Sequence, residues 1–229
     1  MSIHFQLCGL YTGKVSNCFG LTTAINKSMI TEPVYLSLHG IQGDQCADKR
    51  HHGGLERALH QYPVEHYQYW QQKYSSKSLW QAPGMGENLS SIGMSEHNVC
   101  VGDRYQWGEA IIEVSQPRSP CFKLNKRWGI DKLSLEMQKL SLCGWLYRVI
   151  QPGKVSVNEQ LVLLERPANA MTIYQVCELF FGDPMNHAGL VKLKGQTKLS
   201  YSWMNKVEQR IISKQIEDWD FRLLGPENL

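Results

Sequence analysis

Long hydrophobic runs are missing from this chain of 229 residues. No apolar stretch approaches the roughly 20 residues that a membrane-spanning helix requires. The first residues also lack the pattern of a secretion signal, because His4, Gln6 and Gly9 interrupt the apolar positions and no basic segment precedes them. We therefore expect a cytoplasmic protein that does not associate with membranes.

Regularly spaced cysteines are missing too. The seven cysteines stand at positions 8, 18, 46, 100, 121, 143 and 177, an odd number without paired spacing, which is typical of a reducing compartment. No Cys-x-x-Cys or His-x-x-x-His spacing is present to complete a tetrahedral zinc site. A Gly-x-Gly-x-x-Gly fingerprint is also absent, so we expect no flavin or nicotinamide bound in that way.

The chain also lacks a strong net charge of either sign. The chain has 24 Lys and Arg against 21 Asp and Glu, for a net charge of +3, and the basic residues are spread along it. A nucleic-acid-binding domain is expected to carry a clustered basic face, so this composition argues against such a partner. The length suffices to bury a full core, as one large domain or as one domain with an appendage.

The pattern of the chain changes near Pro167. Before it, short apolar runs alternate with turn residues, which is typical of a mostly β barrel or sandwich. The expected strands are 34–36, 98–101, 110–114, 146–150 and 161–164. Helical insertions are expected at 64–74, opened by Pro63 and carrying Val64, Tyr67, Trp70 and Tyr74 on one face, and at 131–140, with Leu133, Met137 and Leu140 as its apolar side.

After Pro167 the spacing becomes helical. Thr172 is expected to cap one helix that Gly182 ends, Pro184 to begin a second through Leu190, and Ser200 or Ser202 to cap a third. A bundle this small would be marginal alone, so we expect it to pack on the β-rich part or on a second subunit. Residues 1–166 and 167–229 are the two predicted domains, and a homodimer is left open.

One cysteine stands in an unusual setting. The string Gln-Pro-Arg-Ser-Pro-Cys at 116–121 follows an expected strand and places Cys121 after two prolines and Arg118. A guanidinium beside a thiol favours the thiolate, the form that attacks electrophiles or binds soft metals. The prolines restrict the backbone that leads to the sulfur. The alternative is that Cys121 is a small buried apolar residue.

A second polar segment lies upstream. His51 and His52 precede Gly53 and Gly54, where successive main-chain N–H groups could form an anion-binding nest. Three cations surround them within nine positions, at Lys49, Arg50 and Arg57. Such a loop suits a phosphate or another oxyanion. A solvated basic turn and a zinc site are the alternatives, although adjacent histidines are a poor chelating pair.

A third loop, at 82–90, has glycines on both sides of a carboxylate and an amide. Glu87 and Asn88 could read the edge of a heterocycle, because an amide both donates and accepts while a carboxylate accepts from N–H groups. The alternative is that Asn88 forms an Asx-turn and that Glu87 lies in solvent.

These segments resemble the MOSC-domain family, in its YiiM-type branch. The resemblance covers nearly the whole chain and is most specific in the Ser-Gln-Pro-Arg-Ser-Pro-Cys string at 115–121, followed by Lys-Leu-Asn at 123–125. The supporting strings are Gly-Asp at 43–44, the run at 49–58, Gly-Glu-Asn-Leu at 86–89, Gly-Asp at 102–103, Trp-Gly-Glu-Ala at 107–110, Gly-Trp-Leu-Tyr at 144–147 and Pro-Gly at 152–153.

The resemblance implies a MOSC-type β-barrel domain, followed by the three-helix domain, and a molybdenum cofactor with Cys121 as the protein ligand to the metal. A thiolate is a soft donor suited to such a metal, and the pterin with its phosphate needs cations and polar contacts. The residues implied for cofactor binding are Lys49, His52, Gly53, Gly54, Arg57, Glu87, Asn88, Arg118 and Cys121. The resemblance leaves the roles of His51 and His60 open.

The resemblance also implies an enzyme that reduces N-hydroxylated compounds, such as hydroxylaminopurines, to amines. Cys121 and His52 are its expected catalytic residues, with His52 as a proton donor because imidazole titrates near neutral pH. The electrons are expected from a separate flavoprotein reductase. Two other functions stay open: a cofactor or sulfur carrier without turnover, and a metal-free cysteine enzyme with His52 as base.

Overall fold

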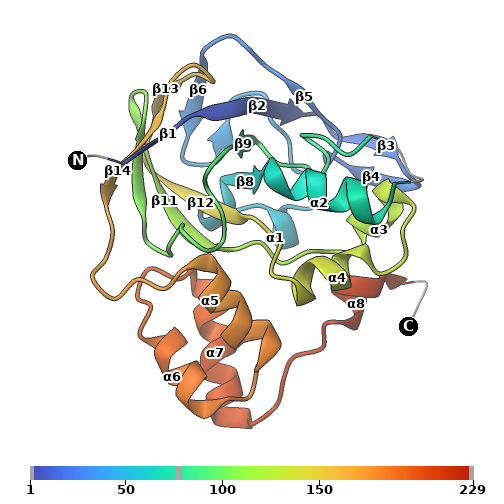
Figure 1. The fold of residues 1–229 in the computed structure, drawn as a ribbon, viewed down its shortest axis with the longest axis vertical. Coiled ribbons are helices and arrows are strands. Elements are labelled where there is room, and N and C mark those ends of the chain that lie inside the picture. The colour runs from blue at the N-terminus through green and yellow to red at the C-terminus, as the bar shows by residue number, and fades with distance from the viewer. Residues whose placement is uncertain (1–2, 76–78, 227–229) are drawn as a thin grey trace.

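The computed structural model describes residues 3–75 and 79–226, and Figure 1 shows the arrangement of their elements. The strands are β1 (His4–Phe5), β2 (Leu7–Gly13), β3 (Ser16–Cys18), β4 (Leu21–Thr23), β5 (Lys27–Met29), β6 (Val34–Ser37), β7 (Gly40–Ile41), β8 (Leu59–Pro63), β9 (Leu89–Ser91), β10 (Arg104–Trp107), β11 (Ala110–Pro117), β12 (Trp145–Gln151), β13 (Gly153–Val155) and β14 (Leu161–Glu165). In the described part of the chain every strand precedes Pro167, as the sequence predicts.

The helices are α1 (Lys49–His52), α2 (Glu65–Lys73), α3 (Lys123–Trp128), α4 (Leu133–Lys139), α5 (Ile173–Cys177), α6 (His187–Lys194), α7 (Tyr201–Ser213) and α8 (Asp220–Leu224). A 3-10 turn, η1 (Leu55–Arg57), follows α1, and a π-helical turn, η2 (Glu178–Gly182), continues α5. No helix within residues 3–75 and 79–226 is both long enough and apolar enough to cross a bilayer. The mostly β class with helical insertions is therefore confirmed, while α1, α3 and α8 were not predicted.

The main sheet has the strand order β1-β14-β10-β11-β12-β8-β9-β2-β5 among the described residues. Neighbouring strands are antiparallel except β8 and β9, which run parallel. The N-terminal segment reaches two distant parts of this order, because β1 pairs with β14 and β2 pairs with β9 and β5. The recorded pairing does not join the two edges, so the closed barrel stays a prediction.

Strand β11 leads directly to the cysteine string. It is buried at every position except Ile111, which lies between buried neighbours. A strand enclosed on both faces fits its surroundings, since β10 and β12 flank it in the sheet and α5 packs against it. Strand β11 therefore provides a rigid support for the residues that follow Pro117.

The predicted strand at 98–101 is wrong. Cys100 makes only an isolated bridge to Thr172, and the segment turns at Gly102, whose φ is +86°. Asp103 stabilises the turn, because its carboxylate accepts a hydrogen bond of 2.9 Å from the Cys100 N–H. The apolar side chains that suggested a strand are buried in this turn instead, and Asp103 has the turn role that the sequence favours.

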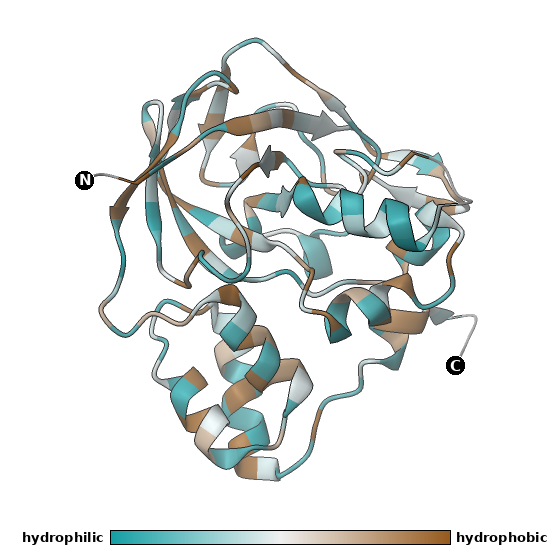
Figure 2. Cartoon of the chain, viewed as in Figure 1, coloured by the Kyte–Doolittle hydropathy of each residue, from teal (hydrophilic) through white to brown (hydrophobic). Residues whose placement is uncertain are grey.

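The helical insertions form a second apolar core beside the main one. Tyr67 and Trp70 of α2 are buried, as the aromatic stripe predicts, and Leu133 and Met137 of α4 join them. Leu140 does not, because α4 ends at Lys139 and the side chain of Leu140 is 40% exposed. In Figure 2 the visible face of α2 is largely hydrophilic, as expected for a helix with one face in solvent.

The C-terminal helices follow the predicted signals with one shift. Thr172 caps α5 in a reciprocal capping box with Gln175, and α7 begins after Ser200. Helix α6 begins at His187 rather than at Pro184, because the side chain of Asn186 accepts a hydrogen bond from Gly189 N–H and caps it there. The buried residues of α5 to α7 are contiguous with the core of the sheet, so the predicted packing of these helices on the β-rich part is confirmed.

Helix α8 leaves this group. Figure 1 shows it beside α4, at the end of a connector that runs back from α7, and contacts between α4 and α8 agree with the view. The region after Pro167 therefore contains three bundled helices and a fourth that packs on the helical insertions of the first region.

An ion pair between the buried Arg210 and the partly buried Glu217 joins the connector to α7. The guanidinium of Arg210, 1% exposed, donates to both carboxylate oxygens of Glu217 at 2.9 and 2.8 Å and to the carbonyl of Phe180 at 2.7 Å. Burial alone would raise the pKa of Glu217, but the hydrogen bonds from Arg210 and Trp219 lower it to about 2. A folded-state pKa below the ordinary 4.5 stabilises the fold above pH 4.5.

We therefore expect the free energy of unfolding to fall between pH 4.5 and pH 2 as Glu217 is protonated. The measurement is urea unfolding at pH 6 and pH 3 for the native chain and for Glu217→Gln. The variant should be less stable at pH 6 and should lose less stability on acidification. An equal pH dependence in both proteins would contradict the assignment.

Candidate functional site

Cys121 lies between β11 and α3, and it is buried with 6% of its surface exposed. Two hydrogen bonds fix its surroundings: Arg118 N–H donates to the carbonyl of Gly144 at 3.1 Å, and Leu124 N–H donates to the carbonyl of Cys121 at 3.0 Å. The sulfur itself accepts hydrogen bonds from the side chain of His52 and from the main-chain N–H of Lys123. The thiol is therefore positioned by both the end of the strand and the start of the helix.

These contacts stabilise the thiolate. Burial raises the pKa of Cys121, but the hydrogen bond from His52, its charge and the charge of Arg118 outweigh burial. The resulting pKa is about 7, below the ordinary value of 9.0. A substantial share of the sulfur is therefore ionised near neutral pH, and the alternative of an inert buried cysteine is less consistent with the structure.

His52 is expected to control the reactivity of this sulfur in the cofactor-free protein. In His52→Gln, the pKa of Cys121 should rise, which lowers the fraction of thiolate at pH 7 but makes each thiolate more nucleophilic. The loss of thiolate is the larger effect, so alkylation by iodoacetamide at pH 7 should slow about fivefold. Mass spectrometry of the Cys121 peptide measures the rate. His51→Gln is the matched control, since His51 is exposed and pairs with Asp48 at 3.0 Å. Equal rates in the two variants would contradict this role of His52.

The guanidinium of Arg118 has an unused donor. Its Nη1 atom is buried and finds no hydrogen-bond partner among the described residues. Two other buried atoms among the described residues can accept a hydrogen bond and also lack a partner: Gln116 Oε1 and His60 Nε2. Gln116 is two positions from Arg118 in the sequence, and the charge of Arg118 acts on the ring of His60. A buried donor without a partner costs on the order of 1–3 kcal/mol, more for a charged group. The arrangement is therefore suited to an anionic or polar ligand that accepts from Arg118.

His60 adds to this environment from β8. Burial lowers its pKa, the charge of Arg118 lowers it further, and the result is well below the usual range of histidine. The ring is therefore neutral near pH 7 and can accept or donate a hydrogen bond without adding charge. Sequence reasoning left the role of His60 open, because an isolated histidine in a strand carries no signal of this neighbourhood.

The loop that holds His52 is organised by short-range contacts. Asp48 caps α1, accepting from His51 N–H at 3.2 Å. Gly53 is tightly packed, since an added Cβ would lie 3.1 Å from the Cα of Lys49. Gly54 has a φ of +104° and nothing within 4 Å of an added Cβ, so its main chain faces open space. A backbone accessible in this way can approach a ligand closely.

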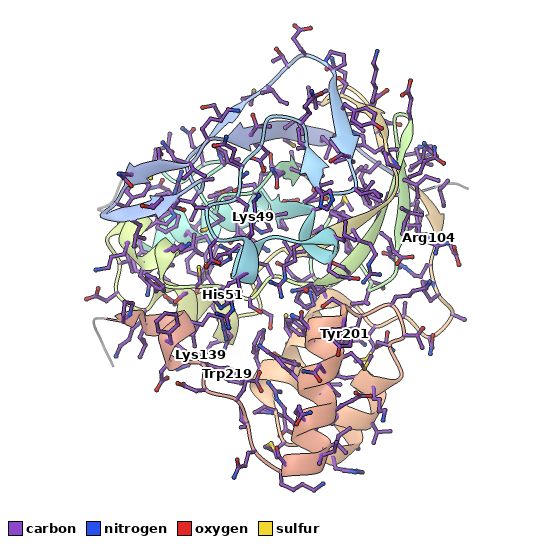
Figure 3. The ribbon with its side chains drawn as sticks, turned by 180° about the vertical axis from the view of Figure 1, so that it is seen from behind. Lys49, His51, Arg104, Lys139, Tyr201 and Trp219 are labelled. Atoms are coloured by element: carbon purple, nitrogen blue, oxygen red, sulfur yellow. The ribbon has the colours of Figure 1, made fainter. Side chains whose placement is uncertain are left out.

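Arg57 ties this loop to the C-terminal helices. Its Nη1 donates to the carbonyl of His51, and its Nη2 donates to the hydroxyl of Ser202 on α7 at 3.0 Å. Figure 3 shows His51 at the edge of the β-rich layer that faces the C-terminal helices, with Trp219 on the far side of this boundary. Lys49 is exposed on α1. Of the cations of the loop, Arg57 therefore lies at the boundary between the two regions.

Asn88 and Glu87 lie deeper, in networks of their own. The amide of Asn88 donates to Asp44 Oδ2 at 2.8 Å and accepts from His60 N–H at 3.1 Å, and Asp44 pairs with Lys27 at 2.6 Å. Glu87 is fully buried and accepts from Tyr67 at 2.5 Å through one oxygen and from a main-chain N–H through the other. Burial raises the pKa of Glu87 to about 7.

The predicted residues thus separate into two groups. The structure brings His52 to the Cys121 sulfur and places the charge of Arg118 near enough to act on it. Arg57, Gly53 and Gly54 belong to the loop that presents His52. Asn88 reaches this group only through the main chain of His60, and the recorded hydrogen bonds of Glu87 remain within its own network. No cluster of three or more His, Cys, Asp or Glu side chains that could hold a metal occurs in residues 3–75 and 79–226.

One residue of the site escaped prediction altogether. Arg222 of α8 donates through Nη1 to the carbonyl of Pro120 at 2.5 Å and through Nη2 to Gln138 Oε1 at 2.7 Å. It stands 101 positions after Cys121 in the sequence, and no local pattern marks it. Only the return of α8 to the β-rich region reveals this contact.

The fold and the site define a class: a mostly β protein with appended helices and a buried cysteine whose ionised form is favoured by a neighbouring histidine and an arginine charge. The MOSC domain matches residues 48–162, which include His52 and Cys121. Protein YiiM from Escherichia coli (strain K12) is 41% identical over 218 residues, which cover 94% of this chain and 97% of that protein. The chain belongs to the MOSC-domain family.

Two further comparisons agree with this assignment. The crystal structure of YiiM from Escherichia coli superposes with a TM-score of 0.85 and 36% identity, covering 97% of this chain and 100% of that one. A protein named Reductase from Gibberella moniliformis is 38% identical over 158 residues, which cover 68% of this chain but only 28% of that protein. The YiiM type recognised from the sequence is thus supported along nearly the whole chain.

Proposed function

We propose that the protein is an oxidoreductase that binds a molybdenum cofactor and reduces N-hydroxylated compounds, such as hydroxylaminopurines, to amines. The observation that carries the proposal is the buried Cys121 sulfur, whose pKa His52 and the charge of Arg118 lower to about 7, near a guanidinium with an unused donor. Membership in the MOSC-domain family and the relative named Reductase support it. When bound, the cofactor supplies two-electron redox chemistry with transfer of an oxygen atom.

The residues present fit such a group. The soft thiolate of Cys121 would ligate the metal, and the free Nη1 of Arg118 would donate to an anionic part of the cofactor. Main-chain N–H groups at Gly53 and Gly54, with Lys49 and Arg57 nearby, would receive the phosphate. Asn88 would support the pterin side by holding the main chain of His60, and Glu87 by holding its own loop.

His52 would move protons in this arrangement. The reduction of an N-hydroxyl group to an amine consumes two electrons and two protons and releases water. The imidazole of His52 is exposed to solvent and hydrogen-bonded to Cys121, so it could deliver a proton taken from bulk water to the leaving oxygen. Burial of Cys121 would exclude bulk water from the thiolate side.

The electrons would come from a partner. The segment of the Gibberella moniliformis protein that matches this chain is only 28% of that protein, so most of that relative lies outside the match. We propose that a separate flavoprotein reductase supplies the electrons here.

One observation favours a second candidate. The hydrogen bond between His52 and Cys121, with a thiol pKa of about 7, is also the arrangement of a cysteine nucleophile with its base. Such enzymes orient the imidazole through a third group. Here the carboxylate of Asp48 hydrogen-bonds to His51 instead, which is why we prefer the metal-dependent function.

The test is turnover of a hydroxylaminopurine by the chain purified anaerobically with its cofactor, using a chemically reduced dye as donor. Amine formation in the loaded protein and none in the cofactor-free chain supports the proposal. Amine formation that persists without molybdenum favours the cysteine enzyme. Cofactor binding without any turnover favours the carrier function.

A further inference from the structure

Helix α8 closes over the loop that carries Cys121. Both the side chain and the main chain of Arg222 hold this loop. The carbonyl of Arg222 accepts a hydrogen bond from Phe122 N–H at 2.8 Å. The carbonyl of Leu223 accepts from Asn125 Nδ2 at 2.9 Å and from Ser134 Oγ at 2.7 Å. One residue of α8 therefore contacts the positions directly before and after Cys121.

The charge of Arg222 faces the same sulfur. Burial lowers the pKa of its guanidinium, and the negative charge of Cys121 is the first group that opposes this effect. Arg118 acts on Arg222 as a like charge, so the two guanidinium groups share one neighbourhood. Two cations kept close together in a partly buried place are expected where an anion is to be bound.

We propose that Arg222 is a positioning residue of the Cys121 site. Its side chain and carbonyl hold the loop on both sides of the sulfur, and its charge adds to that of Arg118 where an anionic group is received. The assignment rests on the proposed function in one respect only: under that function, the anionic group is part of the cofactor. The C-terminal helices thus contribute directly to the thiolate site through α8.

A charge at this place can be measured without the cofactor. Iodoacetate and iodoacetamide alkylate the same thiolate, so the ratio of their rates reports the local charge and is independent of the degree of ionisation. In the cofactor-free Arg222→Gln variant, the ratio at Cys121 should fall about threefold to tenfold, because one positive charge no longer attracts the anionic reagent. The exposed Cys8 of the same chain is the internal reference, and its ratio should stay unchanged.

Arg166→Gln is the matched control. Arg166 also donates twice from its guanidinium, to Asp103 at 2.7 and 2.6 Å. Its loss should leave the ratio at Cys121 unchanged. An unchanged ratio in Arg222→Gln, or an equal fall in Arg166→Gln, would overturn the proposal.

Arg222→Lys separates position from charge. Lysine keeps the charge but cannot donate in one plane to both Pro120 and Gln138. The ratio of alkylation rates should stay within about twofold of the native value. Hydrogen exchange at the Phe122 amide should become at least about fivefold faster, while exchange in the sheet is unchanged. Exchange at the native rate would overturn the positioning role, and because none of these measurements needs molybdenum, their result is separate from that of the proposed function.

Discussion

Replacing Cys121 with alanine is expected to lower bound molybdenum from about one atom per chain to less than about a tenth of that. The variant removes the sulfur donor while leaving the cations of the loop and Arg118 in place, so the pterin alone would have to retain the metal. Reduction of N-hydroxylated substrate should fall with the metal. Metal analysis of the two proteins, purified side by side under anaerobic conditions, makes the comparison.

The control for this variant is Cys46→Ala. Cys46 lies in the same region, where its sulfur donates to the carbonyl of Asp48 at 3.4 Å, and it shares the free thiol chemistry of Cys121. Its replacement should leave the metal content unchanged. Native metal content in Cys121→Ala, or an equal loss in Cys46→Ala, would contradict the assignment of Cys121 as ligand.

Arg210→Ala is expected to destabilise the protein by about 3–5 kcal/mol, because it leaves the partly buried carboxylate of Glu217 and the carbonyl of Phe180 without their donor. The guanidinium also stacks 3.8 Å from the centroid of the Phe180 ring, and this contact is lost as well. Urea unfolding at pH 7 measures the difference, provided that the unfolding remains a single transition.

Lys194→Ala provides the comparison for Arg210→Ala. Lys194 pairs with Glu208 at 3.5 Å, with both side chains about half exposed at 56% and 43%. An ion pair of this kind contributes about 0–1 kcal/mol, so its loss should hardly change the urea midpoint. Equal midpoints for the two variants would contradict the account of α7 and its connector.

The fold class followed from the sequence because its signals are local. Alternating apolar runs and capping residues such as Thr172 each act within a few positions, and the structure confirms them. Pro63, expected to open α2, is instead the last residue of β8, and α2 begins at Glu65. The prediction of a strand at 98–101 was wrong because a buried turn and a buried strand require the same apolar residues. The strand order of the main sheet and the position of α8 depend on contacts between distant segments, which no local pattern encodes.

The residues of the site show the same difference between local and long-range signals. Cys121 and Arg118 are three positions apart in the sequence, and the His-Gly-Gly string presents His52, so a pattern of residue types could select all three. Arg222 contacts the same loop from a distance of about a hundred positions, and the neutral state of His60 arises from its burial beside Arg118. Sequence reasoning finds groups that act through their neighbours in the chain, and it misses groups that act through the tertiary fold.

The most direct measurement is the molybdenum and pterin content of the native chain, purified anaerobically from cells able to make the cofactor. The account predicts about one molybdenum and one pterin for each chain, with the metal retained through gel filtration. A chain that contains neither, and that binds neither on reconstitution, would contradict the central claim and leave the His52–Cys121 pair to be studied as a metal-free thiol site.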